Sequence, residues 1–354
     1  LGECVWRSSV PQLMMSVDAA GCVLSGGDHD SAIWENVFGG RLVYSNLKTP
    51  DEIPPWMDKD RCRRGVEYYM EHLFAFQIAN LDALVMGMCI PSFYKTLEYT
   101  SNSNTRTKAT KRYAATAAFV YSWYCADIWN VSQISHQMIA RVTKMHASTA
   151  HLMQEVSSKR IDSSAVNTPL ESQDWILLEN LAQLRSEREK DSGFEEYEKY
   201  VLHQENPFSQ FDMNLVQSAF FAVLFLYPTE YGFEQSERTS DFLHLWRVFG
   251  YYLGIQDAYN GVRMDDRDTK KLADWNMQRI LIPSMLHLSE SALKMAKLAC
   301  FPGFDYHAMC YFCYQLVGLD LGLLWKSFSI RQKLKYYQKV FFLRYLYPIP
   351  PIKS

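Results

Sequence analysis

Residues 139–153 constrain the fold of this chain most, because their apolar side chains recur with the period of an α-helix. A helix turns by about 100° per residue, so several of these side chains fall within about 60° of His146. They are Ile139, Val142, Thr149, Ala150 and Met153. Gln137, Lys144 and His151 fall on the opposite side. We therefore predict a helix whose inner face carries His146 and whose outer face carries His151.

The inward position of His146 has two interpretations. A lone imidazole in an apolar stripe can be the axial ligand of a haem, whose flat face needs apolar walls. It can equally be a core histidine that is hydrogen-bonded to a backbone carbonyl, and this is the commoner case because buried polar groups usually find a partner. The pattern alone leaves both interpretations open.

A second stripe precedes this segment. Arg112, Thr116, Phe119, Val120 and Trp123 recur at helical spacing within a helix predicted over residues 108–129. A buried guanidinium is costly without an anion, so Arg112 must find one. A haem propionate would serve, and so would a nearby Asp or Glu, which is the favoured partner on the pattern alone.

No run of alternating apolar and polar residues occurs, so we predict an all-α fold. Further helices are expected over residues 61–80, 81–90, 132–157, 170–188, 214–225, 242–253, 272–300 and 307–327. Breaks are expected near Pro91 and Pro283, and Gly254 should end the helix that precedes it.

Composition narrows the classes of function. The chain has 354 residues, 48% of them hydrophobic, and a net charge of −3 without a basic stripe, which argues against a nucleic-acid partner. Twenty-two Tyr, twenty Phe and nine Trp suit either a wide apolar cavity or a large aromatic core. No uncharged apolar run reaches the length of a transmembrane helix. Residues 326–339 are basic and are followed by aromatic residues, which is typical either of a segment on a membrane surface or of a helix docked on its own domain.

Most local motifs for catalysis are missing. Asp265-Asp-Arg-Asp268 resembles the aspartate-rich magnesium site of all-α prenyl-chain enzymes, but no second such motif accompanies it, and a solvated loop is the simpler interpretation. The sequence contains no Glu-x-x-His, no phosphate-binding glycine loop and no nucleophile elbow. A helical cofactor pocket is the interpretation that remains.

Four segments in order resemble one haem family, the rubber oxygenases (latex clearing proteins) and MpaB-type oxygenases. The first two are Lys111-Arg-Tyr-Ala-Ala-Thr116 and Arg141-Val-Thr-Lys-Met-His146. Asn206-Pro with Asp212 and Phe220 follows, and then His244-Leu-Trp-Arg-Val-Phe-Gly-Tyr-Tyr-Leu-Gly-Ile255. The resemblance extends from about residue 54 to about residue 283.

The resemblance implies a globin-like helical core around a b-type haem. His146 would be the proximal iron ligand, and Arg112 and Thr116 would line the haem from the facing helix and take part in catalysis. Arg141 matches a cofactor-binding arginine of the family, and Arg247 is expected in a structural ion pair. Where rubber-cleaving members have a lysine before the threonine, this chain has Ala115, which predicts an iron with room for O₂. Thr143 and the pair Ala150-His151 also depart from those members, and all three departures count against rubber itself as the substrate.

The prediction is therefore one large all-α, haem-b-dependent oxygenase that uses O₂ to oxidise or cleave an apolar isoprenoid or lipid. The alternatives are a non-catalytic haem or lipid carrier of the same fold and a magnesium-dependent prenyl-diphosphate enzyme. We expect an irregular arm at residues 1–55, a haem-binding domain at 56–290, and C-terminal helices with a basic, aromatic tail at 291–354. An endoplasmic-reticulum, other membrane-associated or secretory location stays open.

Overall fold

The computed structural model describes residues 37, 39–45, 47–100, 102–156, 168–188, 197–198, 201 and 208–349. These residues form helices and connecting turns, with one isolated antiparallel bridge between Tyr44 and Ser209 and no strand among them. The predicted all-α class is confirmed. The globin-like arrangement stays a prediction, and most of the expected N-terminal arm lies outside the described residues.

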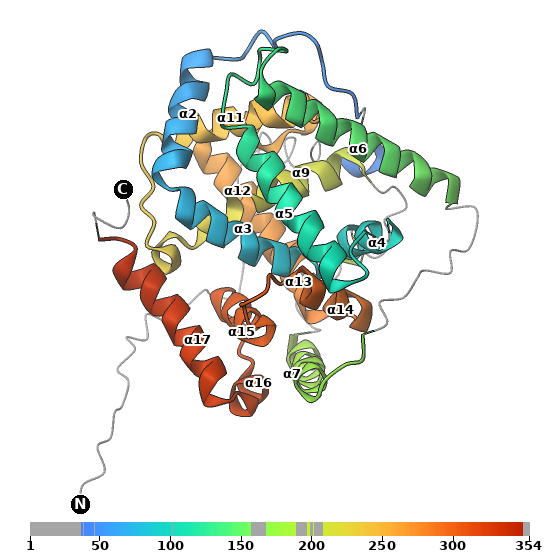
Figure 1. Ribbon diagram of the computed structural model, residues 1–354, viewed down its shortest axis with the longest axis vertical. Helices are drawn as coiled ribbons and strands as arrows, with labels where there is room; N and C mark the ends of the chain where they lie inside the picture. Colours follow the sequence, from blue (N-terminus) through green and yellow to red (C-terminus); the bar gives the residue numbers. More distant parts are fainter. Residues whose placement is uncertain are drawn as a thin grey trace, which may run out of the picture.

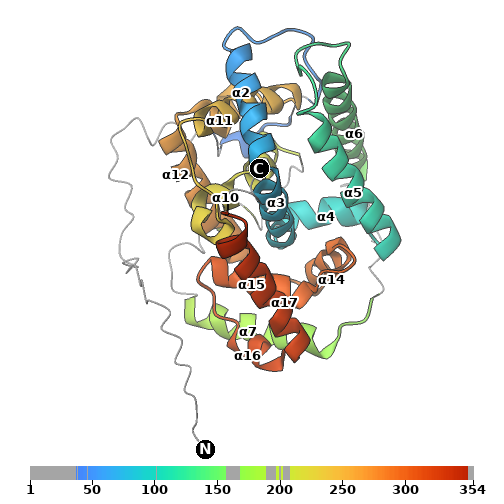
Figure 2. The ribbon, with the colours of Figure 1, turned by 60° about the vertical axis from the view of Figure 1, so that its left-hand side comes forward.

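The first half of the described chain forms α2 (Lys59–Glu71), α3 (Leu73–Gly87), α4 (Pro91–Tyr99), α5 (Arg106–Ser122), α6 (Ile134–Val156) and α7 (Ser172–Arg188). The second half forms α9 (Gln210–Ala219), α10 (Ala222–Leu226), α11 (Thr239–Tyr252), α12 (Asp266–Asn276), α13 (Ile282–Leu286), α14 (Glu290–Ala299), α15 (Tyr306–Leu316), α16 (Gly322–Ser327) and α17 (Ile330–Phe341). Figures 1 and 2 show α2 and α11 at one end of the molecule and α7, α16 and α17 at the other, with α3 between them.

The predicted helix over residues 61–80 is wrong, because the chain breaks at His72. The backbone there leaves the helical region, and the N–H of His72 donates to the carbonyls of Tyr68 and Tyr69. The ring of His72 packs edge-on against Tyr68 at 4.8 Å and Phe233 at 5.0 Å between centroids. A tertiary aromatic contact therefore fixes a break for which the local sequence carries no Gly or Pro.

Other helix ends follow their local signals. Pro91 begins α4, and Gly254 takes a φ of +90° directly after α11, as expected of a glycine that ends a helix. The break expected near Pro283 is confirmed. A π-helical turn, η6 (Met277–Leu281), separates α12 from α13 directly before Pro283, which lies in the first turn of α13. The chain then leaves the helix between Leu286 and the N-cap Ser289 of α14.

One large hydrophobic cluster runs through the described residues from Cys62 to Tyr347, so the C-terminal helices share a core with α2 and α3. Aromatic side chains fill much of it: Tyr69 stacks on Tyr124 with centroids 3.6 Å apart, and Trp246 packs among Trp123, Phe220 and Phe249. Many of the aromatic side chains of the sequence are therefore part of the packed core.

Among the described helices, none alone is long and apolar enough to cross a membrane. Only α3 and α4 taken together reach that length and composition, and they are bent by 90° relative to each other.

Candidate functional site

The two helices that carry the first two motifs, α5 and α6, form a hairpin along one side of the molecule (Figures 1 and 2). The side chain of Thr105 caps α5 by accepting from the N–H of Lys108. Near the turn, the hydroxyl of Ser135 donates to the carbonyl of Ser122 at 2.7 Å. Further along, the guanidinium of Arg141 lies over the ring of Phe119, 5.5 Å from its centroid. These contacts hold α6 beside α5 in a fixed register.

His146 lies on the inner side of α6, and His151 is exposed, as predicted. The Nδ1 atom of His146 is fully buried and has no hydrogen-bond partner within the described part of the chain. Burial, and to a smaller extent the charge of Arg112, lower the pKa of His146 to about 4. The imidazole is therefore neutral near pH 7, and its Nδ1 is not engaged by a hydrogen bond within the described residues.

Arg112 of α5 is half-buried and donates to two hydroxyls, Thr100 Oγ1 at 2.8 Å and Ser103 Oγ at 3.3 Å. Considering only the described residues, no carboxylate lies within ion-pair distance of it. The Asp or Glu that the sequence pattern favoured as the partner of Arg112 is therefore not found among the described residues. Burial lowers the pKa of Arg112, and its charge acts on His146 across the hairpin. The two residues predicted to flank one cofactor do lie near each other.

Thr116 and Arg141 are both exposed. The hydroxyl of Thr116 donates to the carbonyl of Arg112, one turn earlier, at 3.1 Å. Its neighbours Ala114, Ala115, Ala117 and Ala118 are exposed as well, so the middle of α5 presents a face of small side chains. Thr116 therefore lies on an open surface of α5 and not on a buried wall.

Phe208 is a site residue that sequence reasoning missed. Its ring lies 5.6 Å from that of His146, and its backbone takes a φ of +61°, where a bulky side chain costs about 1–3 kcal/mol. The bridge between Tyr44 and Ser209 holds this conformation, with Ser45 N–H donating to Phe208 O at 3.2 Å. The sequence feature that could have pointed to Phe208 is its position directly after the Asn206-Pro motif.

The remaining motif residues are structural. Arg247 binds both carboxylate oxygens of Asp257, at 2.8 and 2.7 Å, and lies over the ring of Trp56, so the predicted ion pair is confirmed. Asp212 forms a capping box with Ser209 at the start of α9, and Phe220 stacks on Trp246. These residues position α9 and α11 against each other.

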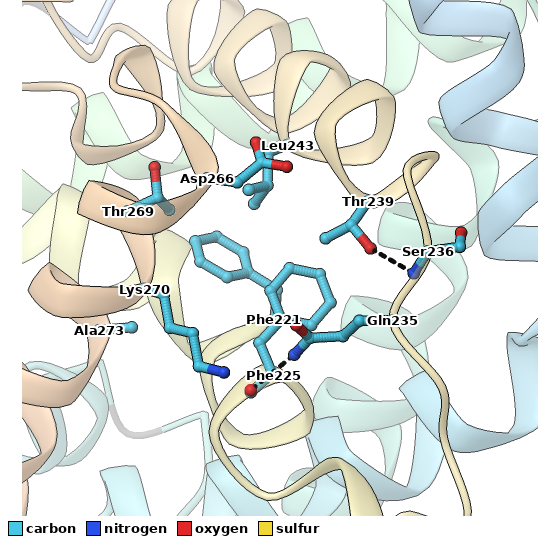
Figure 3. Close-up of a pocket in the computed structure, with 10 residues that line it drawn as sticks. All are labelled: Phe221, Phe225, Gln235, Ser236, Thr239, Leu243, Asp266, Thr269, Lys270 and Ala273. Carbon is cyan, nitrogen blue, oxygen red and sulfur yellow. Dashed lines mark hydrogen bonds between the residues drawn. The ribbon is translucent and has the colours of Figure 1, made fainter.

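The aspartate-rich segment does not form one chelating face. Asp265 caps α12 through the N–H of Asp268, and Asp268 pairs with Lys271 at 2.9 Å. Of the three aspartates of this segment, only Asp266 lines a nearby cavity of about 100 Å³. Figure 3 shows this cavity, with Asp266 above the rings of Phe221 and Phe225. Burial raises the pKa of Asp266. The residues that the structure places contain no group of three His, Cys, Asp or Glu able to hold a metal ion.

Neither of two cavities in the described structure is lined by His146. The first is the one beside Asp266, and the second, of about 280 Å³, lies between α2 and the turn after α5. Ligand pockets usually have volumes of about 300–1,000 Å³. Neither cavity is therefore the wide apolar chamber that the aromatic content allowed.

No protein-family model, curated protein or solved structure matches this chain. The functional argument consequently rests on the site between α5 and α6.

Proposed function

We propose that this chain binds haem b between α5 and α6 and acts as an O₂-dependent oxygenase on an apolar isoprenoid or lipid. The observation that carries the proposal is the combination of two side chains in the described structure. His146 is a neutral imidazole whose Nδ1 has no hydrogen-bond partner, and Arg112 is a guanidinium that has no carboxylate partner. An iron porphyrin supplies both missing partners, because it combines a metal that accepts an imidazole with carboxylates that accept a guanidinium.

A second histidine of α6 shows what an ordinary core histidine looks like in this fold. His136 is buried, and its Nδ1 lies 2.9 Å from the carbonyl oxygen of Ile128, which can only accept a hydrogen bond. His146 lies three turns further along the same helix without such a bond. The contrast supports a ligand role for His146, since a buried polar atom without a partner is costly.

The residues of the hairpin fit the group in type. His146 would hold the iron, Arg112 would bind one propionate, and Arg141 provides a second cation on the same hairpin. The bond from Thr116 to the carbonyl of Arg112 makes Thr116 a positioning residue in this proposal.

Bound haem supplies the activation of O₂, and the chain supplies orientation and access. Ala115 carries no ligating atom, and the alanines around it leave the middle of α5 free of large side chains. Phe208 limits the space beside the imidazole. An apolar substrate would approach along this open face.

The test is an absorption spectrum of the purified protein titrated with hemin. We expect a Soret band in the wild type, and its loss or shift in His146→Ala, with recovery when free imidazole is added. His151→Ala, on the exposed side of the same helix, is the matched control and should leave the spectrum unchanged. Arg112→Gln should weaken hemin binding about tenfold while the axial-ligand spectrum is kept. A wild type without a Soret band, or a His146→Ala variant identical to it, would overturn the proposal.

A non-catalytic haem or lipid carrier of the same fold is the second candidate, because neither described cavity is lined by His146 and so neither offers a substrate a place beside the bound group. O₂ consumption by the haem-loaded protein with a panel of unsaturated lipids separates the two. Turnover supports the oxygenase, and haem binding without turnover across the panel supports the carrier.

A further inference from the structure

The outer face of α17 and the π-helical turn after it, η7 (Phe342–Leu346), carries a continuous apolar stripe. Its five members recur at intervals of three or four residues, so they line up on one side of a helix. All five are well exposed, with exposed fractions of 79% for Ile330, 54% for Leu334, 57% for Tyr337, 54% for Phe341 and 62% for Tyr345. Figures 1 and 2 show that α17 lies at the outside of the molecule. A patch of this kind marks an interaction surface.

The opposite side of the same helix is firmly packed, so the stripe is not a loosely docked inner face. Tyr336 packs edge-on against Trp325 at 5.3 Å and Tyr311 at 5.2 Å. Leu343 and Tyr347 are buried, and Lys339 forms an ion pair with the buried Asp82 of α3. These contacts fix the rotation of α17 and keep the stripe turned outward.

The segment that carries the stripe is basic, although two of its cations are paired, Lys339 with Asp82 and Arg344 with Glu230. Residues 321–354 contain seven Lys or Arg and no Asp or Glu, although the whole chain has a net charge of −3. Lys326 and Arg331 are exposed and form no ion pair with a carboxylate of the described residues, and Lys333 lies over the ring of Trp325. Lysine and arginine stems of this length can reach a surface that the apolar residues contact.

We propose that this face, defined as the stripe residues with Lys326, Arg331 and Lys333, docks on an anionic lipid bilayer. An amphipathic helix with aromatic and aliphatic side chains on one face and cations beside them is suited to the boundary between head groups and acyl chains. Tyr337 and Tyr345 combine an apolar ring with a hydroxyl that stays at the level of the head groups. The complementary charge favours a bilayer whose head groups have a net negative charge over a neutral one.

The inference is independent of the haem proposal, since it uses residues of another part of the fold. If both proposals hold, docking on a bilayer would bring the protein to the lipid in which an apolar substrate dissolves. Vesicle binding can be measured on haem-free protein, so failure of one proposal does not decide the other.

The experiment is flotation of the full chain with phosphatidylcholine vesicles that contain or lack phosphatidylserine. We expect binding only to the anionic vesicles, weakened by salt. The double variant Leu334→Glu/Phe341→Glu should lose binding, and Lys326→Glu/Arg331→Glu should bind at least about tenfold more weakly, given the contribution of each cation near such a surface. Trp175→Glu, an equally exposed aromatic position on α7, is the matched control and should bind as the wild type does.

All these positions are exposed, so circular dichroism should show the same fold in each variant. Wild type that does not float with anionic vesicles overturns the proposal. So does binding that the stripe variant retains. A third contradicting outcome is a dimer, seen by light scattering, that the stripe variant abolishes without any vesicle binding, since the stripe would then face a second copy of the chain.

Discussion

Lys339 of α17 forms an ion pair with Asp82 of α3 across 257 positions of sequence, and Asp82 has no exposed surface. The same carboxylate accepts a hydrogen bond from the hydroxyl of Tyr231 at 2.8 Å. One buried acid therefore connects the C-terminal helix to the centre of the fold and to the segment before α11. This connection decides which side of α17 meets solvent.

Replacing Asp82 with Asn should destabilise the protein strongly. The amide cannot balance the charge of Lys339, and removing one partner of a buried ion pair lowers the free energy of unfolding by about 3 kcal/mol or more. Urea unfolding followed by circular dichroism measures the loss. Asp60→Asn removes the exposed partner of Arg63, at 2.9 Å, and should change the free energy of unfolding by less than about 1 kcal/mol. Similar effects at both positions would contradict the role given to Asp82.

The low pKa of His146 predicts a specific dependence of stability on pH. In the unfolded chain an imidazole titrates near its usual pKa of 6.5, whereas in the folded protein the pKa is about 4. Between these values the unfolded state binds more protons, so stability is full above about pH 6.5 and falls as the pH drops toward 4.

The variant His146→Phe cannot titrate and should lose part of this dependence, by up to roughly 3 kcal/mol between the two pH limits. The measurement is urea unfolding of both proteins over that pH range. His244, whose pKa burial also lowers to about 4, should keep a similar dependence in both proteins. Parallel pH profiles of wild type and variant would contradict the assignment.

Removing the charge of Arg112 should raise the pKa of His146. Burial is the larger cause of the low value, so we expect the pKa of His146 to rise in Arg112→Gln but to stay below the usual 6.5. Titration of the imidazole by NMR measures it. Arg141→Gln is the control, because Arg141 is exposed and its ring contact is with Phe119. An unchanged pKa in Arg112→Gln would show that the two side chains are not neighbours in solution.

Gly65 allows α2 and α11 to approach closely, and Gly65→Ala should separate them. A Cβ there would lie 2.7 Å from the carbonyl oxygen of Asp241, a backbone atom that cannot move without shifting α11. We expect a loss of about 1–3 kcal/mol in thermal or urea unfolding. In Gly87→Ala the new methyl group would meet only Phe93, at 3.8 Å, so this variant should be neutral or slightly more stable. Equal losses of stability in Gly65→Ala and Gly87→Ala would contradict this explanation, because the close approach of α2 and α11 would then not account for the effect at Gly65.

Much of the helical architecture could be predicted because helix formation is largely a local property. The periods of the apolar residues located α5, α6 and α7 to within a few residues, except that the helix expected over 108–129 ends at Ser122. The break at His72 could not be predicted, because Phe233, which packs on it, is 161 positions away. The inward stripe predicted for α5 is only partly correct. Arg112 is half-buried, but Thr116, which was placed on the same stripe, is exposed.

The sequence by itself determined the all-α class, the inward side of His146 and the one-signed charge of the C-terminal segment. Each of these follows from periodicity or from the chemistry of one side chain. Only the tertiary structure decided that Arg112 meets hydroxyls and lies near His146, and that α17 turns its apolar stripe outward. Those outcomes depend on which distant groups, such as Thr100, Phe208 and Asp82, the packing of the helices brings into contact, and no local pattern encodes that choice.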